Sequence, residues 1–289
     1  MTKTKILIFG KHGQVGGQLV AQLSGREDIA VIATDIEDVD LTDDRATRQL
    51  VLDHGPDWVV NTSAHTAVDR AEEEQSLARQ LNAIAPGVIA KACKEIDAAM
   101  VHYSTDYVFD GIASAPYLES DTTNPRSVYG KTKLEGEQAV FSVLEKAIIL
   151  RTAWVYSRNG KNFVNTMLRL AKERDALNVV CDQYGSPTLA DDLAAATIAV
   201  IDQLTAGPVD DAWGLYHATG SGVINWSGFT ESILKLSGHY GVVVNPIPSS
   251  EYPTPAPRPA YSVLSNEKLK KRFAIELPHW QDALERCLS

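Results

Sequence analysis

Short apolar runs recur along the first half of the chain, separated by polar turns and helical patterns. The runs are Lys5–Gly10, Ala30–Thr34, Trp58–Asn61, Ala98–Tyr103 and Ala147–Tyr156. A continuous apolar run of this length is typical of a strand buried on both faces, as in a parallel sheet covered by helices. The alternation of these runs with helical segments predicts an α/β fold built on a doubly wound parallel sheet.

Apolar residues at helical spacing predict the helices between and after these strands. The expected helices are Val15–Leu23, Ala71–Leu81, Ala85–Lys94, a segment that begins near Val128, Asn162–Lys172, Asp191–Leu204, Trp226–Leu236, Asn266–Phe273 and Trp280–Leu288. Beyond Tyr156 the strand–helix rhythm loosens, and short strands are expected at Asn178–Asp182 and Gly214–Ala218.

A glycine-rich turn separates the first strand from the first helix. Gly10, Gly13 and Gly16 stand three residues apart in this turn. Glycine permits the unusual turn dihedrals, and it lets backbone N–H groups approach a pyrophosphate at the positive end of the helix. In this strand–turn–helix context the glycines predict the cofactor-binding turn of a Rossmann-type domain.

An acidic residue closes the second strand. Asp35 lies about 20 residues beyond the glycine turn, where a carboxylate binds the ribose hydroxyls of the adenosine half of a dinucleotide. A carboxylate at this place repels a 2′-phosphate and favours NADH. Lys11, beside Gly10, could partly offset that repulsion, so we expect both NADH and NADPH to be accepted.

Small and polar residues follow the third strand, from Thr62 to Asp69, and fit a place where a cofactor lies close to the backbone. His65 in this stretch could act as an acid or base, but a histidine packed beside the cofactor is the favoured interpretation. Asn82 lies between two expected helices, and a cap or turn role is favoured for it.

The fourth strand ends in Ser104, Thr105 and Asp106, at the edge of the sheet where ligands bind. Tyr129 and Lys133 follow at i and i+4 near the start of a helix, so both lie on one helix face. A neighbouring ammonium favours the phenolate and lowers the pKa of a tyrosine. Beside a bound nicotinamide, this pair predicts a general acid tuned by a lysine.

Two further residues are candidates for substrate contact. Trp154 near the end of the fifth strand could stack on a substrate or fill the core, and the sequence leaves both open. Glu251–Pro259 is rich in proline and therefore stiff, and it carries Arg258. A guanidinium on a stiff segment suits a diphosphate, although a surface ion pair explains it as well.

These patterns predict two interleaved parts. We expect residues 1–156 to form the dinucleotide-binding Rossmann domain, with later segments returning to it. Residues 157–289 are expected to form mainly a smaller C-terminal substrate-binding lobe. Because no linker is visible, we expect this lobe to be interleaved with the sheet domain.

Charge and composition limit the kinds of partner that we expect for this protein. The formal net charge is −10, so a broad basic face for nucleic acid is not expected. The apolar run near the N-terminus is too short for a secretion signal, and no run is long enough to cross a membrane. The three cysteines, Cys93, Cys181 and Cys287, are far apart, which predicts reduced thiols in a cytoplasmic protein and no zinc site.

In order along the chain, the motifs resemble those of the extended short-chain dehydrogenase/reductases. The motifs are GKHGQVG, NTSAHTAVD, HYSTDYVFDG, NPRSVYGKTKLEGE, RTAWVY, DQYGSPT and TPAPRP, and they span nearly the whole chain. The resemblance is to members that reduce a nucleotide-linked 4-keto sugar, with NADPH or NADH as the hydride source. The pattern STDYVFDG followed by VYGKTKLEGE is quite specific to this subgroup.

The resemblance implies roles for individual residues. It implies a catalytic triad of Thr105, Tyr129 and Lys133, and substrate contacts from Thr105, Asp106 and Trp154. The implied cofactor contacts are Gly13, Gln14, Val15, Asp35, Asp40, Leu41, Ala64, His65, Thr66, Tyr103, Tyr129 and Lys133. Some members form magnesium-bridged dimers through carboxylates, but Gln18 stands near one of those places, so no metal is expected; a homodimer remains open.

Two alternative functions stay open at this point. One is a nucleotide-sugar epimerase or dehydratase, which regenerates its own cofactor. Dehydratases of this kind are expected to carry an acid directly after the Thr-Asp pair, where this chain has Tyr107. The other is a non-catalytic regulatory subunit of the same fold, which an intact set of Thr105, Tyr129 and Lys133 makes less favoured.

Overall fold

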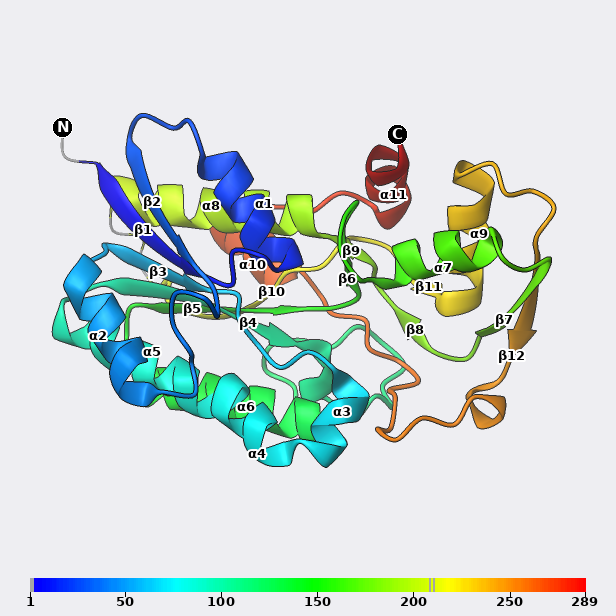
Figure 1. Ribbon diagram of the computed structural model, residues 1–289, viewed down its shortest axis with the longest axis horizontal. Coiled ribbons are helices and arrows are strands. Elements are labelled where there is room, and N and C mark those ends of the chain that lie inside the picture. Colours follow the sequence, from blue (N-terminus) through cyan, green and yellow to red (C-terminus); the bar gives the residue numbers. More distant parts are fainter. Residues whose placement is uncertain (1–2, 208, 210) are drawn as a thin grey trace.

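A six-stranded parallel sheet forms the centre of the protein in the computed structural model, which describes residues 3–207, 209 and 211–289 (Figure 1). Residues 1 and 2 of the expected first domain lie outside this range. From one edge to the other the strands are β10 (Gly214–His217), β5 (Ala147–Thr152), β4 (Ala99–Thr105), β3 (Trp58–Asn61), β1 (Thr4–Phe9) and β2 (Ile29–Thr34). All neighbouring pairs run parallel, which confirms the predicted fold class.

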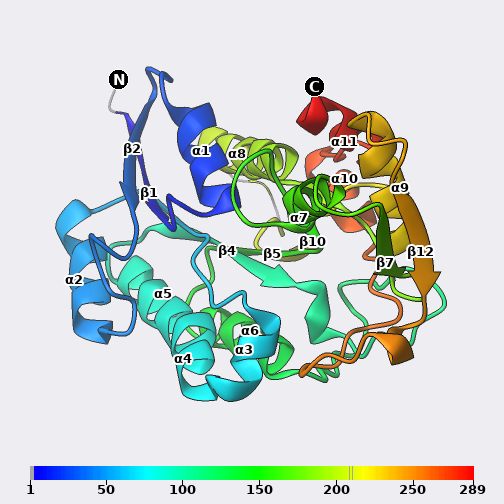
Figure 2. The same cartoon turned by 45° about the vertical axis from the view of Figure 1, so that its right-hand side comes forward.

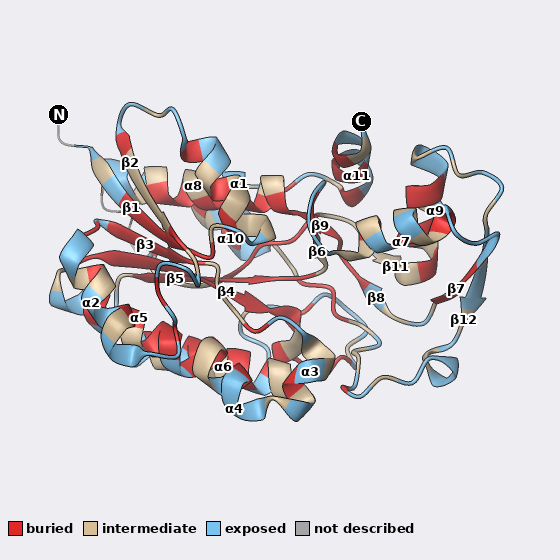
Figure 3. Ribbon diagram, viewed as in Figure 1, coloured by how far each residue is buried: buried red, intermediate tan, exposed pale blue. Residues whose placement is uncertain are grey.

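Helices cover both faces of this sheet, because every central strand is apolar on both sides. On one face α1 (Gln14–Leu23), α8 (Ala190–Ala206) and α10 (Glu267–Phe273) share a buried core with the strands. On the other face α2 (Asp44–His54), α5 (Ala85–Glu95) and α6 (Val128–Phe141) do the same. Figure 3 shows the buried strands between two layers of helices whose outer surfaces are exposed.

The chain between β3 and α5 differs from its prediction. It forms α3 (Val68–Glu73), α4 (Gln75–Arg79) and a π-helical turn η1 (Gln80–Ile84) that runs directly into α5. Asn82 is therefore neither a cap nor part of an open turn. It is buried in η1, and its side chain hydrogen-bonds the backbone N–H and carbonyl of His65 and the hydroxyl of Thr132.

The expected strand over 147–156 is also interrupted. Trp154 has a φ of 51°, a left-handed conformation that is uncommon for a non-glycine residue. This turn directs β6 (Val155–Tyr156) out of the main sheet, where it pairs with β9 (Thr188–Leu189). Helix α2 and strand β12 (Val243–Ile247) were not predicted.

A second, smaller lobe packs around its own core. It contains α7 (Phe163–Ala171), β7 (Ala176–Val180), α9 (Trp226–Leu236), β12 and α11 (Trp280–Leu288), together with the two-residue strands β8 (Tyr184–Gly185) and β11 (Ile224–Asn225). Figure 2 shows α7, α9, β7 and β12 together on the side away from β1 and β2. Short 3-10 turns, η2 (Asp106–Val108) and η3 (Ser249–Glu251), complete the described elements.

The chain passes between the two parts more than once. After building α7 and β7 it returns to the sheet as α8 and β10, crosses to α9 and β12, and returns again as α10. This path agrees with the expected interleaving of later segments with the sheet. The assignment of residues 157–289 to substrate binding concerns function and stays a prediction.

Close packing at the glycine turn gives a test of this fold. A Cβ on Gly16 would lie 2.0 Å from the carbonyl oxygen of Gly10, whereas a Cβ on Gly17 would meet its nearest atom at 3.4 Å. We expect Gly16→Ala to lower the free energy of unfolding by about 1–3 kcal/mol through overpacking. The matched change Gly17→Ala should be neutral or stabilise by up to about 1 kcal/mol. Equal effects of the two changes in urea unfolding would contradict this packing.

Candidate active site

One large cavity opens at the carboxyl ends of the central strands. Its volume is about 1070 Å³, at the upper end of the range for ligand sites. In the sheet β1 lies between β2 and β3, so the order of the strands reverses beside β1. Open parallel sheets bind ligands at such a reversal, beyond the carboxyl ends of the strands.

The glycine turn forms one wall of this cavity. Gly10 has a φ of 89° and Gly13 is the N-cap of α1, which has no side-chain hydrogen bond at its start. The first N–H groups of α1 are therefore available to an anion. A Cβ on Gly10 would lie 2.6 Å from the Thr62 hydroxyl oxygen, so a larger residue here would clash with the segment after β3. These features fit the pyrophosphate of a dinucleotide.

Asp35 lies at the end of β2 and lines the same cavity. Its carboxylate accepts hydrogen bonds from the backbone N–H of His12, at 3.0 Å, and of Ile36, at 2.9 Å. The carboxylate is thus attached to the glycine turn, beside the place where the turn would hold a pyrophosphate.

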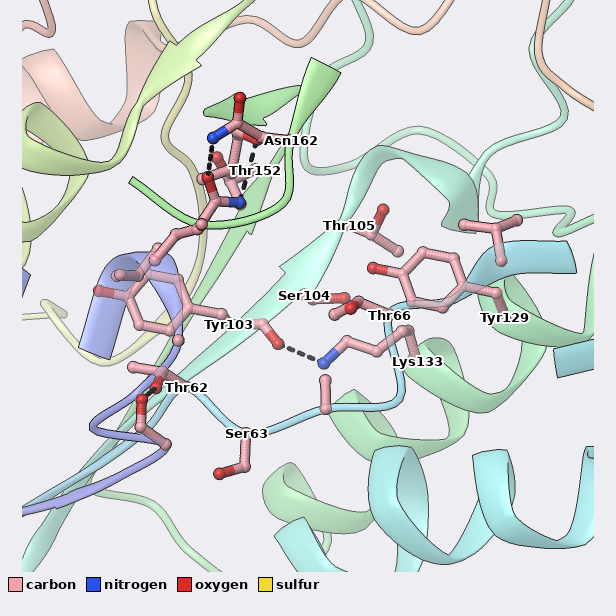
Figure 4. A pocket seen from close by; sticks show the side chains of 18 of the residues that line it. Thr62, Ser63, Thr66, Tyr103, Ser104, Thr105, Tyr129, Lys133, Thr152 and Asn162 are labelled. Atoms are coloured by element: carbon pink, nitrogen blue, oxygen red, sulfur yellow. Dashed lines mark hydrogen bonds between the residues drawn. The ribbon is translucent and has the colours of Figure 1, made fainter. Parts of the chain in front are cut away.

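The opposite wall carries Thr105, Tyr129 and Lys133 (Figure 4). Helix α6 begins directly before Tyr129, because Ser127 caps it and the carboxylate of Glu72 accepts the N–H of Val128 at 2.8 Å. The ammonium of Lys133 donates to the backbone carbonyl of Tyr103 at 2.6 Å. The end of β4 and the first turns of α6 therefore present these three side chains together.

Burial determines the protonation states of Tyr129 and Lys133. It raises the pKa of Tyr129 to about 12, while the hydrogen bond with Thr105 acts in the opposite direction. It lowers the pKa of Lys133 to about 8, and the carboxylate of Glu137 partly opposes this. The expectation of a lowered pKa for Tyr129 is wrong for this structure, because the effect of burial dominates. Tyr129 therefore holds its proton at neutral pH.

Asp106 lies beside Thr105 and is fully buried. The Thr105 hydroxyl donates to its Oδ1 at 2.9 Å, and burial raises the pKa of the Asp106 carboxyl to about 6. Asp106 is one of the residues that line the cavity, and its Oδ2 is buried without a hydrogen-bond partner within 3.5 Å among the described residues, while Ser262 acts to lower the pKa of this carboxyl. A buried acceptor without a partner is costly, so this oxygen is suited to a hydroxyl group of a ligand.

A buried ion pair lies directly behind this wall. Arg151 on β5 makes a bidentate contact with Glu137 on α6, with distances of 2.8 and 2.6 Å. The Ser104 hydroxyl also donates to the Glu137 carboxylate. Tyr129, Lys133 and Glu137 follow at four-residue intervals, so they lie along one face of α6. The ion pair thus joins the helix that carries Tyr129 to both β4 and β5.

The second lobe closes the cavity with aromatic side chains. Trp154 stacks on Trp226, with ring centroids 3.3 Å apart and planes within 5°, and Phe163 lies against Trp226. All three line the cavity. Trp154 therefore stacks on another side chain of the protein while lining the cavity, and its contact with a substrate stays a prediction.

Arg258 also lines the cavity, and it takes part in an ion pair. Its guanidinium donates to Asp69 at 2.8 Å and to the carbonyl of Ala256 at 3.1 Å. Asp69 in turn accepts the N–H of Ala256 at 3.1 Å. The proline-rich segment is therefore attached to α3, and it points its one arginine at the cavity.

Most of the expected site residues come together in this cavity. The expected residues that line it are Gly10, Gly13, Gln14, Val15, Asp35, Leu41, Ala64, Thr66, Tyr103, Thr105, Asp106, Tyr129, Lys133, Trp154 and Arg258. Tyr103 contributes its backbone, because its phenol hydroxyl bonds Thr197 on α8.

Three expected cofactor contacts do not line the cavity. Gly16 packs against Gly10 and acts through that close approach. The Asp40 carboxylate accepts the N–H and hydroxyl of Thr42, in an exposed turn before α2. His65 is turned towards Glu74, with Nε2 at 2.8 Å from its carboxylate, because Asn82 holds the His65 backbone in place.

Sequence reasoning missed a loop that crosses the cavity mouth. The Gln14 amide oxygen accepts hydrogen bonds from Ser157, at 2.9 Å, and Asn162, at 3.0 Å. Gln14 therefore joins the glycine turn to the loop before α7, which also carries Lys161. Neither this bridge nor the contribution of Trp226 had a local signal, since the partners lie far apart in the sequence.

Comparison with known proteins gives close full-length matches. A sequence model of the family described as RmlD substrate binding domain matches residues 4–289. A dTDP-4-dehydrorhamnose reductase from Burkholderia thailandensis is 44% identical and aligns with 98% of each chain. Among solved structures, a dTDP-4-dehydrorhamnose reductase from Clostridium acetobutylicum has a TM-score of 0.93 at 42% identity, covering 99% of this chain and 98% of that one. The enzyme of that name from Bacillus anthracis, solved with NADP, has a TM-score of 0.91 at 34% identity and 99% coverage of both chains.

Proposed function

The chain belongs to the RmlD substrate binding domain family, and from this premise we propose that it is a dTDP-4-dehydrorhamnose reductase. The reaction is the reduction of the C4 ketone of dTDP-4-dehydro-L-rhamnose to the alcohol of dTDP-L-rhamnose, with NADPH or NADH as cofactor. The observation that carries the proposal is the shared cavity. Thr105, Tyr129 and Lys133 line this cavity together with the glycine turn and Asp35, which supports the proposal.

The cofactor, when bound, supplies the hydride that reaches the carbonyl carbon. The N–H groups of the glycine turn would hold its pyrophosphate, and Asp35 its adenosine ribose. Lys133 and Tyr129 would hold the second ribose. Lys133 Nζ already lies at the Tyr103 carbonyl, at the end of β4, so its position does not depend on a ligand.

Tyr129 is the general acid in this proposal, and it gives its proton to the ketone oxygen. A buried phenol that holds its proton at neutral pH is suited to donate it when negative charge develops on that oxygen. The charge of Lys133 stabilises the phenolate that remains. Without substrate the Thr105 hydroxyl donates to Asp106, so it must turn to the ketone oxygen to assist.

The sugar nucleotide is assigned to the part of the cavity between Asp106, Trp154 and Arg258. The unpartnered Oδ2 of Asp106 would accept a sugar hydroxyl, and the Trp154 ring would pack against an apolar face of the sugar or base. Arg258 would bind the diphosphate through its guanidinium.

No observation favours the alternative functions. Tyr107 occupies the position after Asp106, and its ring meets Tyr129 edge-on at 5.6 Å, so no acid stands there. The likeness to a UDP-glucose 4-epimerase from Thermus thermophilus, at 19% identity, concerns the fold alone.

Localisation and partners are proposed on chemical grounds. The three cysteines are unpaired thiols, which fits a cytoplasmic protein, and the charge of −10 argues against nucleic acid as a partner. Among the described residues no helix is long and apolar enough to span a membrane.

The proposal is tested by incubating the protein with dTDP-4-dehydro-L-rhamnose and NADPH or NADH. Oxidation of the cofactor should be followed by its loss of absorbance, and the product should be identified as dTDP-L-rhamnose. Folded protein that binds the dinucleotide but gives no turnover would overturn the proposed reaction.

Replacement of the general acid gives a sharper test. Tyr129→Phe should lower kcat by roughly a hundredfold or more, because the proton donor is lost while the ring remains. The dissociation constant for the dinucleotide should stay within about twofold. Turnover close to that of the wild type would remove Tyr129 from the mechanism.

The pH dependence should report Lys133. The pKa of Lys133 is about 8, so kcat/KM should fall as the pH rises through about 8 and the ammonium becomes neutral. Glu137→Gln removes the carboxylate that raises this pKa, and the alkaline limb should move to lower pH. Glu137→Asp keeps the charge and should leave the limb in place. If the alkaline limb of the kcat/KM profile lies at the same pH in Glu137→Gln and in the wild type, Lys133 is excluded as its cause.

Arg258 has a separate test. Arg258→Ala should raise KM for the sugar nucleotide by roughly tenfold or more, since charged hydrogen bonds to the diphosphate are lost. Binding of the dinucleotide should not change. Asp69→Asn is the matched control, because it removes the partner but keeps the guanidinium. If both variants raise KM equally, Arg258 acts only through its ion pair with Asp69.

A further inference from the structure

The adenosine-ribose end of the cavity is surrounded by a compact group of charges, here called the ribose-end cluster. Its members are Lys11, His12, Asp35, Glu37 and Asp38. Lys11 Nζ lies 2.6 Å from an oxygen of Asp38 and 2.9 Å from one of Glu37. His12 Nε2 contacts the same oxygen of Glu37 at 2.7 Å.

The sequence allowed Lys11 to be a free cation at this place, but in the structure its ammonium is paired with Glu37 and Asp38. Lys11 is adjacent to Gly10, where it could have met a phosphate on the ribose. Instead its ammonium lies between two carboxylates from the turn after β2. The Asp38 carboxylate also accepts the backbone N–H of Asp35 at 2.9 Å, which fixes this carboxylate within its own turn. Lys11 is therefore engaged before any cofactor arrives.

The cluster carries a net negative charge. The ammonium of Lys11 contributes +1 and the three carboxylates contribute −3, which leaves −2 with His12 neutral. Lys11 lowers the pKa of Glu37 to about 2 and lowers the pKa of Asp38 as well, so both are ionised at neutral pH. A 2′-phosphate carries additional negative charge into this cluster, whereas a 2′-hydroxyl carries none.

Of the ribose-end cluster, His12 and Asp35 line the cavity and Lys11 does not, so the cluster contributes no lysine to the described lining. The remaining basic residues of the described lining are Lys133, Lys161 and Arg258. Lys133 bonds the Tyr103 carbonyl, Arg258 bonds Asp69, and Lys161 belongs to the loop that Gln14 holds.

We propose that this chain selects NADH over NADPH, and that Glu37 and Asp38 are the residues that set this selectivity by engaging Lys11. The inference rests on the proposed function, since it concerns the cofactor pocket of that site. A relative from Bacillus anthracis has been solved with NADP, so the fold itself accepts a 2′-phosphate. The selectivity is accordingly assigned to the ribose-end cluster of this chain and to no general feature of the fold.

The test is a binding measurement that needs no sugar substrate. Full-length protein is titrated with NADH and with NADPH at low ionic strength, and binding is followed by energy transfer from tryptophan to the reduced nicotinamide. We expect NADH to bind about tenfold or more tightly than NADPH, because juxtaposed like charges are strongly unfavourable. Added salt should bring the dissociation constants of NADH and NADPH closer together, since the charges are exposed.

The double variant Glu37→Gln with Asp38→Asn releases Lys11 while keeping the hydrogen-bonding shapes. It should tighten NADPH binding by about tenfold and change NADH binding by less than about twofold. Adding Lys11→Met to this double variant should abolish the gain in affinity for NADPH. A matched control is the double variant Glu95→Gln with Asp97→Asn, which removes two exposed, ion-paired carboxylates near the start of β4, at the opposite end of the sheet. The ratio of the dissociation constants for NADH and NADPH in this control variant should equal that of the wild type.

The outcomes separate this inference from the function on which it rests. Equal or tighter binding of NADPH by the wild type would overturn the selectivity alone. An unchanged ratio in the Glu37 and Asp38 double variant would overturn the assignment to these residues. If circular dichroism shows folded protein that binds neither dinucleotide, the proposed reductase function fails together with the inference.

Discussion

The packing of helix α6 against the end of β4 and against η1 is the constraint on which the site depends. Two glycines make it possible. A Cβ on Gly130 would lie 2.2 Å from the carbonyl oxygen of Tyr107, and a Cβ on Gly136 would lie 2.1 Å from that of Asn82. Backbone therefore meets backbone along this helix, which leaves its side chains little freedom to shift. Tyr129 is held by a rigid element, as its proposed role as general acid requires.

Burial at this contact also determines the chemistry. Glu137 and Arg151 are both 3% exposed, and removal of either one would leave an uncompensated buried charge. The same low-polarity surroundings keep the proton on Tyr129 and bring Lys133 close to its point of deprotonation. The raised pKa of Tyr129 and the lowered pKa of Lys133 therefore share one physical cause, which is the exclusion of water from the face of α6 that meets the sheet.

The cavity exists because the chain crosses between two cores. The left-handed turn at Trp154 sends the chain from β5 into the second lobe, and the returning α8 packs beside α1 on the sheet. Gln14 then bonds Asn162 across the mouth of the cavity. The wall formed by the glycine turn and the aromatic wall are thus joined by the covalent chain and by hydrogen bonds.

Periodicity, turn chemistry and helix spacing are local properties, so the sequence predicts the parallel sheet, the glycine turn with Asp35, and the shared helix face of Tyr129 and Lys133. Features that depend on distant partners follow from folding and leave no local pattern. The ion pairs of Lys11 and the bridging role of Asn82 arise between segments that folding brings together. The raised pKa of Tyr129 arises from burial, which no local spacing records, and it reversed the expectation drawn from Lys133 alone.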